Sequence, residues 1–391
     1  MKKLFDDTEI AFALKSNTDL NTSYLLFKMM NFKPLVKIGT KFINLALKLH
    51  LPVENLIRKT IFNQFCGGIN EEDCLKVVDI IFTKGVSTVL DYAVEGKAVE
   101  TEFENALEKT LKIIEFAKER QAIPFAVFKP TSFGRIDLYE KKGKQEVLSS
   151  EEQKEWTDVI ARFEKVCQTA CQKNVAVLID AEESWMQTTA DELVLEMMRK
   201  YNKEKVIVYN TVQMYRWDRM DYLKAIHQKA QSEGFFVGIK LVRGAYMEKE
   251  NERAEEENYK SPICASKQET DENYDLALQY SIANLDIFSL FAGTHNESSS
   301  YYLMQLMKEK NIVTNDGRIW FGQLYGMSDT ISFNLAARGY NVAKYVPFGP
   351  VKEVVPYLIR RAQENTAVIG QTSRELEMII KERQRRKNSN N

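Results

Sequence analysis

The chain has 391 residues, of which 44% are hydrophobic and 28% are charged, as is typical of a globular protein with a sizeable core. Its 54 Lys and Arg residues balance 55 Asp and Glu residues, so the net charge does not favour nucleic acid as a partner. No run of 18 apolar residues occurs, and two aspartates at positions 6 and 7 interrupt any signal-peptide core. We expect a cytoplasmic protein, with peripheral contact to the inner face of the cell membrane as an open alternative.

The N-terminal part, residues 1–85, is predicted to be a helical region that packs on the rest of the chain. Residues 20–64 are rich in helix formers, and "FINLALKLHL" at 42–51 is a short amphipathic stretch. Such a stretch either packs on the protein or lies on a membrane surface, and we favour packing. The five cysteines show no metal-ligand spacing, so we expect reduced packing cysteines and no metal site.

From residue 86 the pattern changes to short β-rich runs that alternate with segments long enough for helices. The predicted strands are 86–92, 125–130, 175–180, 206–211, 237–242, 287–293, 318–322 and 342–349. The predicted helices are 101–121, 152–173, 188–202, 218–233, 270–285, 297–311, 328–339 and 351–366. Strands that are apolar on both faces and alternate with helices favour a parallel sheet.

Eight strand–helix units predict an α/β protein with a (βα)₈ barrel over residues 86–370. An open, doubly wound sheet is the competing topology, but no GxGxxG motif follows any predicted strand. Residues 371–391 are predicted to be a polar tail, and the segment "KERQRRKNSNN" is expected to be disordered.

Polar side chains stand at the end of every predicted strand, where barrel enzymes carry their chemistry. In chain order they are Asp91, Lys129, Asp180, Gln213, Lys240, Thr294, Gln323 and Tyr345, with Arg243, Gly244 and Tyr246 after the fifth strand and His295 after the sixth. A lone residue of this kind is usually a cap or a salt bridge. Eight in register predict a polar basin ringed by helix N-termini, which suits anions.

The longest predicted loops, 131–151 and 247–269, lie on the same side of the barrel as these residues. Long loops at this face often form lids or walls of a cofactor site.

The last predicted barrel helix contains two adjacent arginines. Tyr357 precedes Arg360 by three residues and Arg361 by four, and Glu364 continues the same polar face. The opposite side is apolar, with Val354, Leu358 and Ala362. Two guanidinium groups beside a phenol suit a carboxylate ligand. A solvated helix face with an Arg–Glu pair is the alternative reading.

Several long motifs closely resemble the proline dehydrogenase family of flavoenzymes. They are "FAVFKPTSFGR" (125–135), "VLIDAEES" (177–184), "GIKLVRGAY" (238–246), "FGQLYGMSD" (321–329) and "YVPFGPVKEVVPYLIRRAQEN" (345–365). The resemblance covers roughly residues 1–370 and is to the short, monofunctional form. It implies a distorted (βα)₈ barrel that binds FAD without a covalent bond, oxidises L-proline to Δ1-pyrroline-5-carboxylate and passes electrons to a membrane quinone.

The resemblance also implies roles for particular residues at the substrate. Paired arginines bind the substrate carboxylate in the family, and Arg360 and Arg361 match them. Further substrate positions are matched by Lys129, Asp180, Leu324, Tyr345 and Tyr357, and we predict catalytic roles for Lys129, Asp180 and Tyr345.

The predicted cofactor site is assigned in the same way. Gln213 and Lys240 match family positions at the flavin ring, and Arg243, Tyr246, Lys267, His295 and Glu364 match positions around the rest of FAD. Gly244, Thr294 and Gln323, which come from the strand-end pattern, complete it. Some relatives have Arg where Lys240 stands and Lys where Arg243 stands, an exchange that keeps the charge and changes the hydrogen-bond geometry.

The expected reaction is transfer of a hydride from C5 of proline to N5 of the flavin, which requires the two atoms to be held close and aligned. Lys129, Asp180 and water all stay open as acceptors of the amine proton. Three other functions also stay open: oxidation of hydroxyproline, a lyase that forms a Schiff base through Lys129 or Lys240, and a flavin- or amino-acid-binding barrel without turnover.

Overall fold

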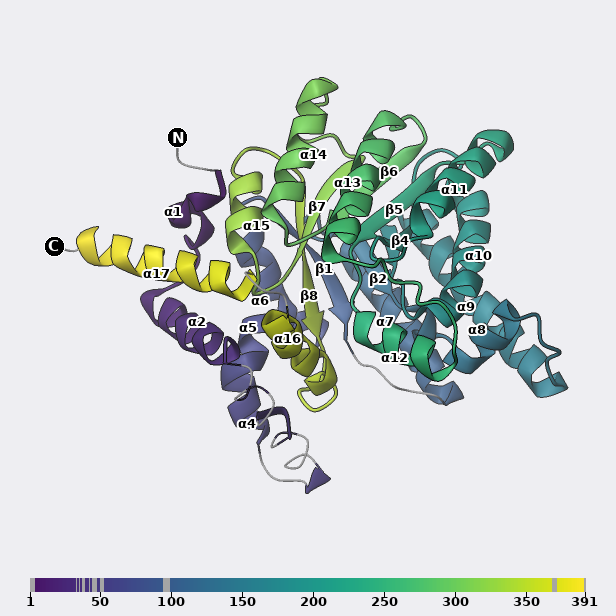
Figure 1. Cartoon of the computed structure of the whole chain (residues 1–391), viewed down its shortest axis with the longest axis horizontal. Helices are drawn as coiled ribbons and strands as arrows, with labels where there is room; N and C mark the ends of the chain where they lie inside the picture. The colour runs from purple at the N-terminus through teal and green to yellow at the C-terminus, as the bar shows by residue number, and fades with distance from the viewer. Residues whose placement is uncertain are drawn as a thin grey trace. The chain divides into compact units, whose positions relative to one another are not determined.

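The computed structural model describes residues 4–389 except 33, 35, 37–38, 42, 44–47, 50–52, 94–98 and 368–370, and at 56, 363–367 and 371–373 it describes only the backbone. Most of the predicted amphipathic stretch 42–51 therefore lies outside the described residues. Eight strands form a closed barrel in chain order (Figure 1). They are β1 (Val86–Tyr92), β2 (Phe125–Phe128), β3 (Ala176–Ile179), β4 (Val208–Gln213), β5 (Val237–Val242), β6 (Phe288–Gly293), β7 (Ile319–Leu324) and β8 (Val342–Phe348).

Helices alternate with these strands, as the sequence predicts. The helices that follow β1 to β8 are α7 (Glu100–Lys118), α9 (Ser150–Lys173), α10 (Ser184–Tyr201), α11 (Arg219–Glu233), α13 (Lys267–Ala283), α14 (Glu297–Glu309), α15 (Asp329–Ala336) and α16 (Val355–Ala367). Before β1 come η1 (Leu4–Asp6), α1 (Thr8–Ala11), α2 (Asn17–Met30), α4 (Glu54–Ile57), η2 (Arg58–Phe62), α5 (Asn63–Phe65) and α6 (Glu71–Phe82). The predicted (βα)₈ barrel is confirmed, and each predicted strand overlaps an observed one.

The two predicted long loops contain short helices. Residues 131–151 include α8 (Ile136–Gly143), which follows the 3₁₀ turn η3 (Pro130–Ser132), and residues 247–269 begin with α12 (Met247–Glu256). A loop-only reading of these segments is therefore wrong, because their charge-rich sequences still support helices of 8 and 10 residues.

The chain divides into two compact units. One unit is residues 97–322, with β2 to β6 and most of β7. Its strands run parallel, and all of β2 and β4 is buried, as expected for a sheet covered by helices. Parallel strands place their carboxyl ends at the same edge of the sheet, so residues after β2 to β6 share one edge.

The other unit is residues 1–96 with 323–391, and it holds β1 paired parallel with β8. It has its own apolar cluster, which includes Phe27 on α2, Phe65 on α5 and Leu358 on α16. Gly326 is required in this unit, since its φ is +77° and a Cβ there would lie 1.9 Å from the Gln64 carbonyl oxygen.

The C-terminal tail is helical, which makes the prediction of disorder wrong. Helix α17 (Gln371–Ser389) lies alongside α2 within its unit (Figure 1). Met378 and Ile379 are buried, and Arg386 donates hydrogen bonds to the carbonyls of Lys15 (2.8 Å) and Phe12 (2.9 Å). Composition alone suggested a polar segment, but these apolar positions give the segment a face to bury.

Within the described parts of the chain, no helix is long and apolar enough to cross a membrane. The five cysteines are free thiols, and only Cys171 is exposed.

Candidate active site

A buried ion pair joins two of the predicted site residues in residues 97–322. Lys240 lies within β5 and Asp180 directly follows β3, and the Lys240 Nζ is 2.5 Å from the Asp180 Oδ1. The lysine side chain is 7% exposed and the aspartate side chain 18%. A pair this buried interacts strongly because little water screens it. The structure therefore confirms that these two strand ends meet.

Gln213 is the last residue of β4 and is 2% exposed. Its Nε2 donates to the Glu182 carbonyl at 3.0 Å, which fixes the orientation of the amide. Its Oε1 is buried, and no described residue donates a hydrogen bond to it. A buried acceptor of this kind costs free energy unless a ligand satisfies it.

Three of the predicted cofactor residues gather after β5 and β6. The Arg243 guanidinium contacts Asp271 Oδ1 (2.6 Å), Thr294 Oγ1 (2.9 Å) and Ser299 Oγ (3.0 Å). The second oxygen of Asp271 contacts Lys267 Nζ at 2.5 Å. Burial raises the pKa of Asp271, but hydrogen bonds from Lys267 and Arg243 outweigh it and hold the pKa below its usual value. Arg243, Lys267 and Thr294 thus form one cationic cluster around a shared carboxylate.

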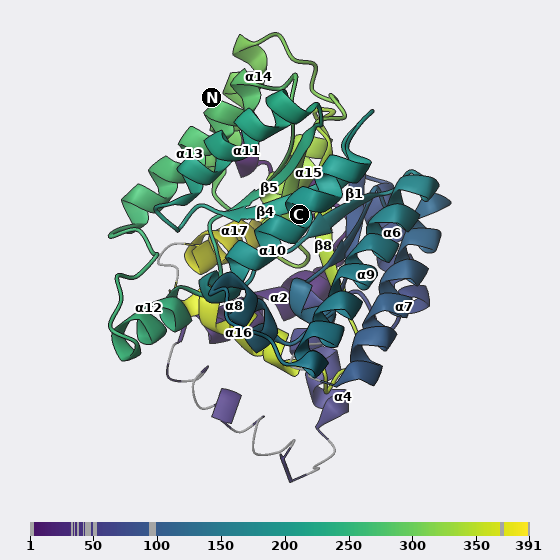
Figure 2. The same ribbon diagram turned by 90° about the vertical axis from the view of Figure 1, so that its right-hand side faces the viewer.

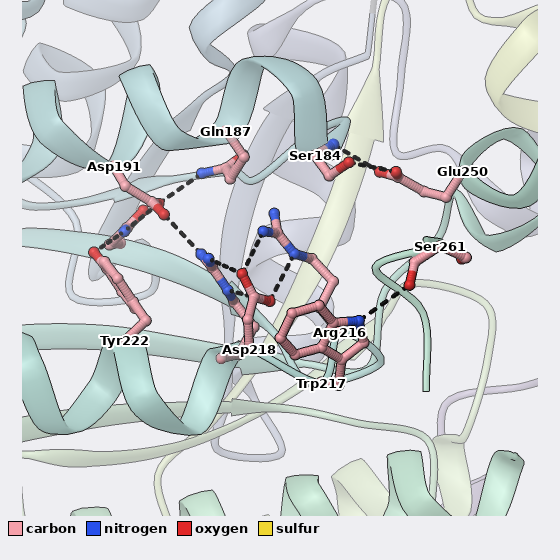
Figure 3. Close-up of polar contacts among 11 residues, drawn as sticks. Ser184, Gln187, Asp191, Arg216, Trp217, Asp218, Tyr222, Glu250 and Ser261 are labelled. Carbon is pink, nitrogen blue, oxygen red and sulfur yellow. Dashed lines mark hydrogen bonds and ion pairs between the residues drawn. The ribbon is translucent and has the colours of Figure 1, made fainter. Parts of the chain in front are cut away.

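The turn after Gln213 is fixed by a second network (Figure 3). Asp191 on α10 accepts hydrogen bonds from Gln187 (2.8 Å) and from Arg219 (2.7 Å). Asp218 lies between Arg216 and Arg219, and the two guanidinium groups lower its pKa to about 2 against the effect of burial. The turn that begins at Gln213 is therefore held on one side by a buried acid–arginine network.

The same turn also anchors the segment that returns from α12. The Trp217 indole donates to the Ser261 carbonyl at 3.0 Å (Figure 3). Cys264 N donates to the Tyr215 carbonyl at 2.7 Å. On the other side of α12, Gly244 lies between β5 and this helix with φ +132°, and a Cβ there would lie 2.6 Å from the Tyr215 ring. Only glycine fits at this position, since other residues would meet both steric overlap and an unfavourable φ.

Helix α12 is clamped to the helices beside it. Glu250 accepts hydrogen bonds from Ser184 N (2.6 Å) and Ser184 Oγ (2.5 Å) at the start of α10, and burial raises the pKa of Glu250 (Figure 3). Lys249 pairs with Glu183, and Arg253 Nη2 is 2.5 Å from Glu140 on α8. The views in Figures 1 and 2 place α12 near α8. The predicted lid segment is thus fastened at three points.

Three further predicted residues lie at the same edge of this unit. Lys129 is the residue between β2 and η3, His295 follows β6, and Tyr246 directly precedes α12. All three are half-buried. Their positions agree with the predicted strand ends.

In the other unit, a buried cluster supports the middle of β8. Lys344 is 1% exposed, pairs with Asp329 at 2.8 Å and donates to the Met327 carbonyl at 2.7 Å. The next residue, Tyr345, is 6% exposed, and its carbonyl accepts from Tyr325 N at 2.8 Å. The turn that follows β7 is therefore tied to β8 at two consecutive residues.

The predicted residues of β7 lie in this unit as well. Gln323 is 2% exposed and its Oε1 accepts from Ser332 Oγ at 2.9 Å. Leu324 is half-buried and packs against the apolar cluster of the unit. Gln323 is thus held by α15, a contact that the sequence did not indicate.

Helix α16 has the predicted apolar side, but Tyr357, which was predicted on the opposite polar face, also belongs to the apolar cluster. Leu358 and Ala362 are buried in the apolar cluster of the unit, as expected. Tyr357 is 5% exposed and Arg361 8%, and the Arg361 guanidinium lies 5.3 Å from the centre of the Tyr357 ring. Such a contact is a cation–π interaction. Arg360 is half-buried, and the side chain of Glu364 lies outside the described residues.

Several residues of these networks were missed in the sequence, chiefly Thr131, Glu182, Asp271, Ser299, Lys344 and Asp329. Two of them carried a signal that could have been used. Glu182 stands two residues after the Asp180 strand end, and Asp271 stands four residues after Lys267 on one helix. The others depend on contacts between distant segments.

A strand-by-strand arrangement of buried charges and amides at the carboxyl ends of a closed (βα)₈ barrel is the architecture of a barrel enzyme. A family model described as proline dehydrogenase matches residues 74–374. The chain belongs to the proline dehydrogenase family and is an oxidoreductase.

Two relatives illustrate the range of the family. The chain is 36% identical over 322 residues to the carbapenem antibiotics biosynthesis protein CarD of Pectobacterium carotovorum subsp. carotovorum, covering 82% of this chain and 83% of that protein. It is 33% identical over 430 residues to the mitochondrial proline dehydrogenase 1 of Dictyostelium discoideum, covering 98% and 75%.

A solved structure shares the fold. Proline utilization A from Bdellovibrio bacteriovorus, inactivated by N-propargylglycine, has a TM-score of 0.71 at 19% identity and aligns with 93% of this chain. The aligned region is 37% of that longer chain.

Proposed function

We propose that this protein oxidises L-proline to Δ1-pyrroline-5-carboxylate with bound FAD and passes the electrons to a quinone. The observation that carries the proposal is the buried Lys240–Asp180 pair beside Gln213 in a chain of this family. These groups supply, in one place, a cation, a carboxylate and an amide with a free acceptor.

The residues after β4, β5 and β6 suit FAD. The buried Oε1 of Gln213 requires a donor, and a flavin ring offers an N–H group of that kind. The Arg243 and Lys267 cations, with the Thr294 hydroxyl that accepts a hydrogen bond from Arg243, suit a diphosphate. Gln213 and Lys240 would hold the ring, and the remaining groups would hold the rest of the cofactor.

When bound, FAD supplies the two-electron acceptor for the hydride that leaves C5 of proline. Lys240 places a positive charge where negative charge develops on reduction, which favours the reaction. Arg360 and Arg361 bind the substrate carboxylate, while Leu324, Tyr345 and Tyr357 bind the ring. The proton of the substrate amine passes to Lys129, Asp180 or water.

The proposed quinone acceptor requires contact with a membrane, because quinones of this class reside in lipid. We propose a cytoplasmic enzyme that contacts the inner face of the membrane peripherally. Flotation of the holoenzyme with lipid vesicles tests this contact: co-flotation supports it, and recovery of all protein in the dense fraction contradicts it.

An assay of the purified protein tests the reaction. We expect a yellow protein that releases FAD on denaturation, reduces a short-chain quinone when L-proline is added, and yields a product that reacts with o-aminobenzaldehyde as a cyclic imine does. A colourless protein that turns over a carbonyl substrate through borohydride-trappable lysine would indicate a Schiff-base lyase instead. A yellow protein without turnover would indicate a binding barrel.

A further inference from the structure

Two consecutive glutamates follow the end of β3, and each binds a different segment of the chain. Glu183 pairs with Lys249 on α12. Glu182 is 5% exposed and accepts two hydrogen bonds from Thr131, one from the backbone N to Oε2 at 2.9 Å and one from Oγ1 to Oε1 at 2.7 Å. Both carboxylate oxygens of Glu182 are therefore used to hold a single residue on a different strand–loop junction.

Thr131 belongs to the turn that carries Lys129. The turn η3 begins directly after Lys129, and Ser132 N donates to the Lys129 carbonyl at 2.9 Å. Pro130 fixes its own φ, and its carbonyl accepts from the Tyr139 hydroxyl at 2.8 Å. The position of the Lys129 backbone thus depends on contacts at each of the next three residues. Among these described contacts, only the two hydrogen bonds from Thr131 to Glu182 involve a charged group.

The backbone of Glu182 is fixed as well. Its N–H donates to Gln187 Oε1 at 2.9 Å, and its carbonyl accepts from Gln213 Nε2 at 3.0 Å. Glu182 therefore connects the turn after β2 to the amide at the end of β4. Hydrogen bonds hold both the backbone and the carboxylate of Glu182, so the residue is rigid. A rigid residue can fix the geometry of its neighbours.

We propose that Glu182 is a positioning residue for the oxidation of proline, which fixes the turn after β2 and through it the ammonium group of Lys129. This inference rests on the proposed function, in which Lys129 stands near the substrate. Glu182 acts through Thr131 and the charge of Lys129, and has no direct role at the reacting atoms.

The electrostatics agree with the geometry. Burial raises the pKa of Glu182 to about 7, while the charge of Lys129 and the hydrogen bonds from Thr131 oppose the rise. The groups that face Glu182 are Lys129 and Thr131 beside β2, Tyr139 on α8, Gln187 on α10, Gln213 on β4 and the adjacent Glu183. An ionised carboxylate accepts both Thr131 bonds and pairs electrostatically with the ammonium. Protonation of Glu182 weakens both the hydrogen bonds from Thr131 and the attraction to the Lys129 ammonium. Lys129 should therefore be best ordered above neutral pH.

The test compares Glu182→Gln with Glu183→Gln in the holoenzyme. The amide in Glu182→Gln has nearly the same shape, but it lacks the charge and turns a donor towards Thr131. We expect kcat/KM for L-proline to fall by about tenfold to a hundredfold, with FAD content unchanged. The pH profile of kcat/KM should have an inflection near pH 7 in the wild type and in Glu183→Gln that is lost in Glu182→Gln.

A second pair of variants keeps the test decisive if Glu182→Gln does not fold. Thr131→Val removes the hydroxyl donor and keeps the backbone donor, and Thr131→Ser keeps both. We expect a loss of about tenfold in kcat/KM for the valine variant and restoration by serine. Equal activity and equal pH profiles across these variants would overturn the role of Glu182. Failure of the wild-type holoenzyme to oxidise L-proline would instead overturn the proposed function.

Discussion

Two groups of site residues, one in each unit, are held by different forces. In residues 97–322 the side chains are fixed by ion pairs and hydrogen bonds, with Lys240 on Asp180 and Arg243 on Asp271. In the other unit, Tyr357 and Arg361 lie on α16, and that helix is fixed by burying Leu358 in an apolar cluster. A buried ion pair depends on both partners, whereas an amphipathic helix keeps its place when a polar residue is changed. Substitutions at Lys240 or Asp180 should therefore affect folding and activity together, and substitutions of the α16 arginines mainly activity.

The largest effects are expected at the Lys240–Asp180 pair. Lys240→Met leaves a buried carboxylate without its cation, which should lower the free energy of unfolding by about 3 kcal/mol. It should also lower the midpoint potential of the bound flavin, since a cation beside the ring stabilises the anionic reduced form. Chemical denaturation and a potentiometric titration measure the two effects.

The double variant Lys240→Met/Asp180→Leu separates stability from function. It removes both charges and should recover most of the stability, because well-packed apolar residues replace a buried pair at little cost. The flavin potential should stay low. If the single and the double variants were equally stable, the unpaired Asp180 carboxylate would not be the cause of the loss in Lys240→Met.

The arginines of α16 should show the opposite behaviour. In Arg360→Met and Arg361→Met, KM for L-proline should rise about tenfold to a hundredfold, because each loses a charged hydrogen bond to the carboxylate. The free energy of unfolding should change by no more than about 1 kcal/mol. Steady-state kinetics and thermal unfolding provide the two readouts.

Two controls sharpen the arginine experiment. Arg361→Lys keeps the charge and loses the planar fork, so its KM should lie between the methionine variant and the wild type. Lys352→Met removes an exposed cation just before α16 that pairs with Glu54, and it should leave KM unchanged. Unchanged KM in both arginine variants would remove the carboxylate role of α16.

Substrate choice should follow from Tyr345. This residue is 6% exposed and lies in the middle of β8, and we expect its ring to fill the space beside the substrate ring carbons. A hydroxyl at C4 would then be overpacked, so kcat/KM should favour L-proline over trans-4-hydroxy-L-proline by about tenfold or more. Tyr345→Ser should lower activity on proline and narrow this gap. Comparable values for the two substrates in the wild type would contradict this position for the ring.

An effect confined to stability is expected within residues 323–391, where stability should depend on pH. Glu375 is buried, and burial with the nearby Asp329 charge raises its pKa to about 7. The folded state then holds a proton that the unfolded state releases from about pH 4.5 upward, so the stability falls as pH rises from 4.5 to 7. Glu375→Gln does not titrate and should gain about 2–3 kcal/mol over the wild type between pH 5 and pH 8.

Glu382 on the same helix is a control of opposite sign. Burial raises its pKa, but hydrogen bonds from Arg385 and Arg386 outweigh burial and lower it. Its contribution is therefore present above the ordinary pKa and lost as pH falls through the folded value. Glu382→Gln should be destabilised at neutral pH and approach the wild type in acid. Thermal unfolding of both variants across this pH range measures the effect, and parallel curves for the two would refute it.

Much of the barrel could be predicted from the sequence, because the signals for it are local. Short apolar runs such as "VSTVLDY" (86–92) and "FAVFKP" (125–130), each followed by a segment long enough for a helix, contain β1 and β2. The helical tail could not be read this way. Its few apolar residues, Met378 and Ile379, become informative only once α2 provides a surface to pack against.

The site residues, too, were predictable where the signal was local and not where it depended on distant contacts. The end of each strand predicted Asp180, Gln213 and Lys240, since parallel strands bring their carboxyl ends to one edge. The pairing of Lys240 with Asp180, and the use of Glu182 to hold Thr131, join residues that are 60 and 51 positions apart in the chain. Contacts at such separations leave no periodic signal, so the structure was needed to find them.

The most direct test of the account is an anaerobic titration of the purified FAD-containing protein with L-proline, followed by the visible absorbance of the flavin. We predict that the band bleaches as proline is added and recovers when a quinone is supplied. A flavin band that stays unchanged at saturating L-proline, in a protein that retains its FAD, would contradict proline oxidation by this enzyme.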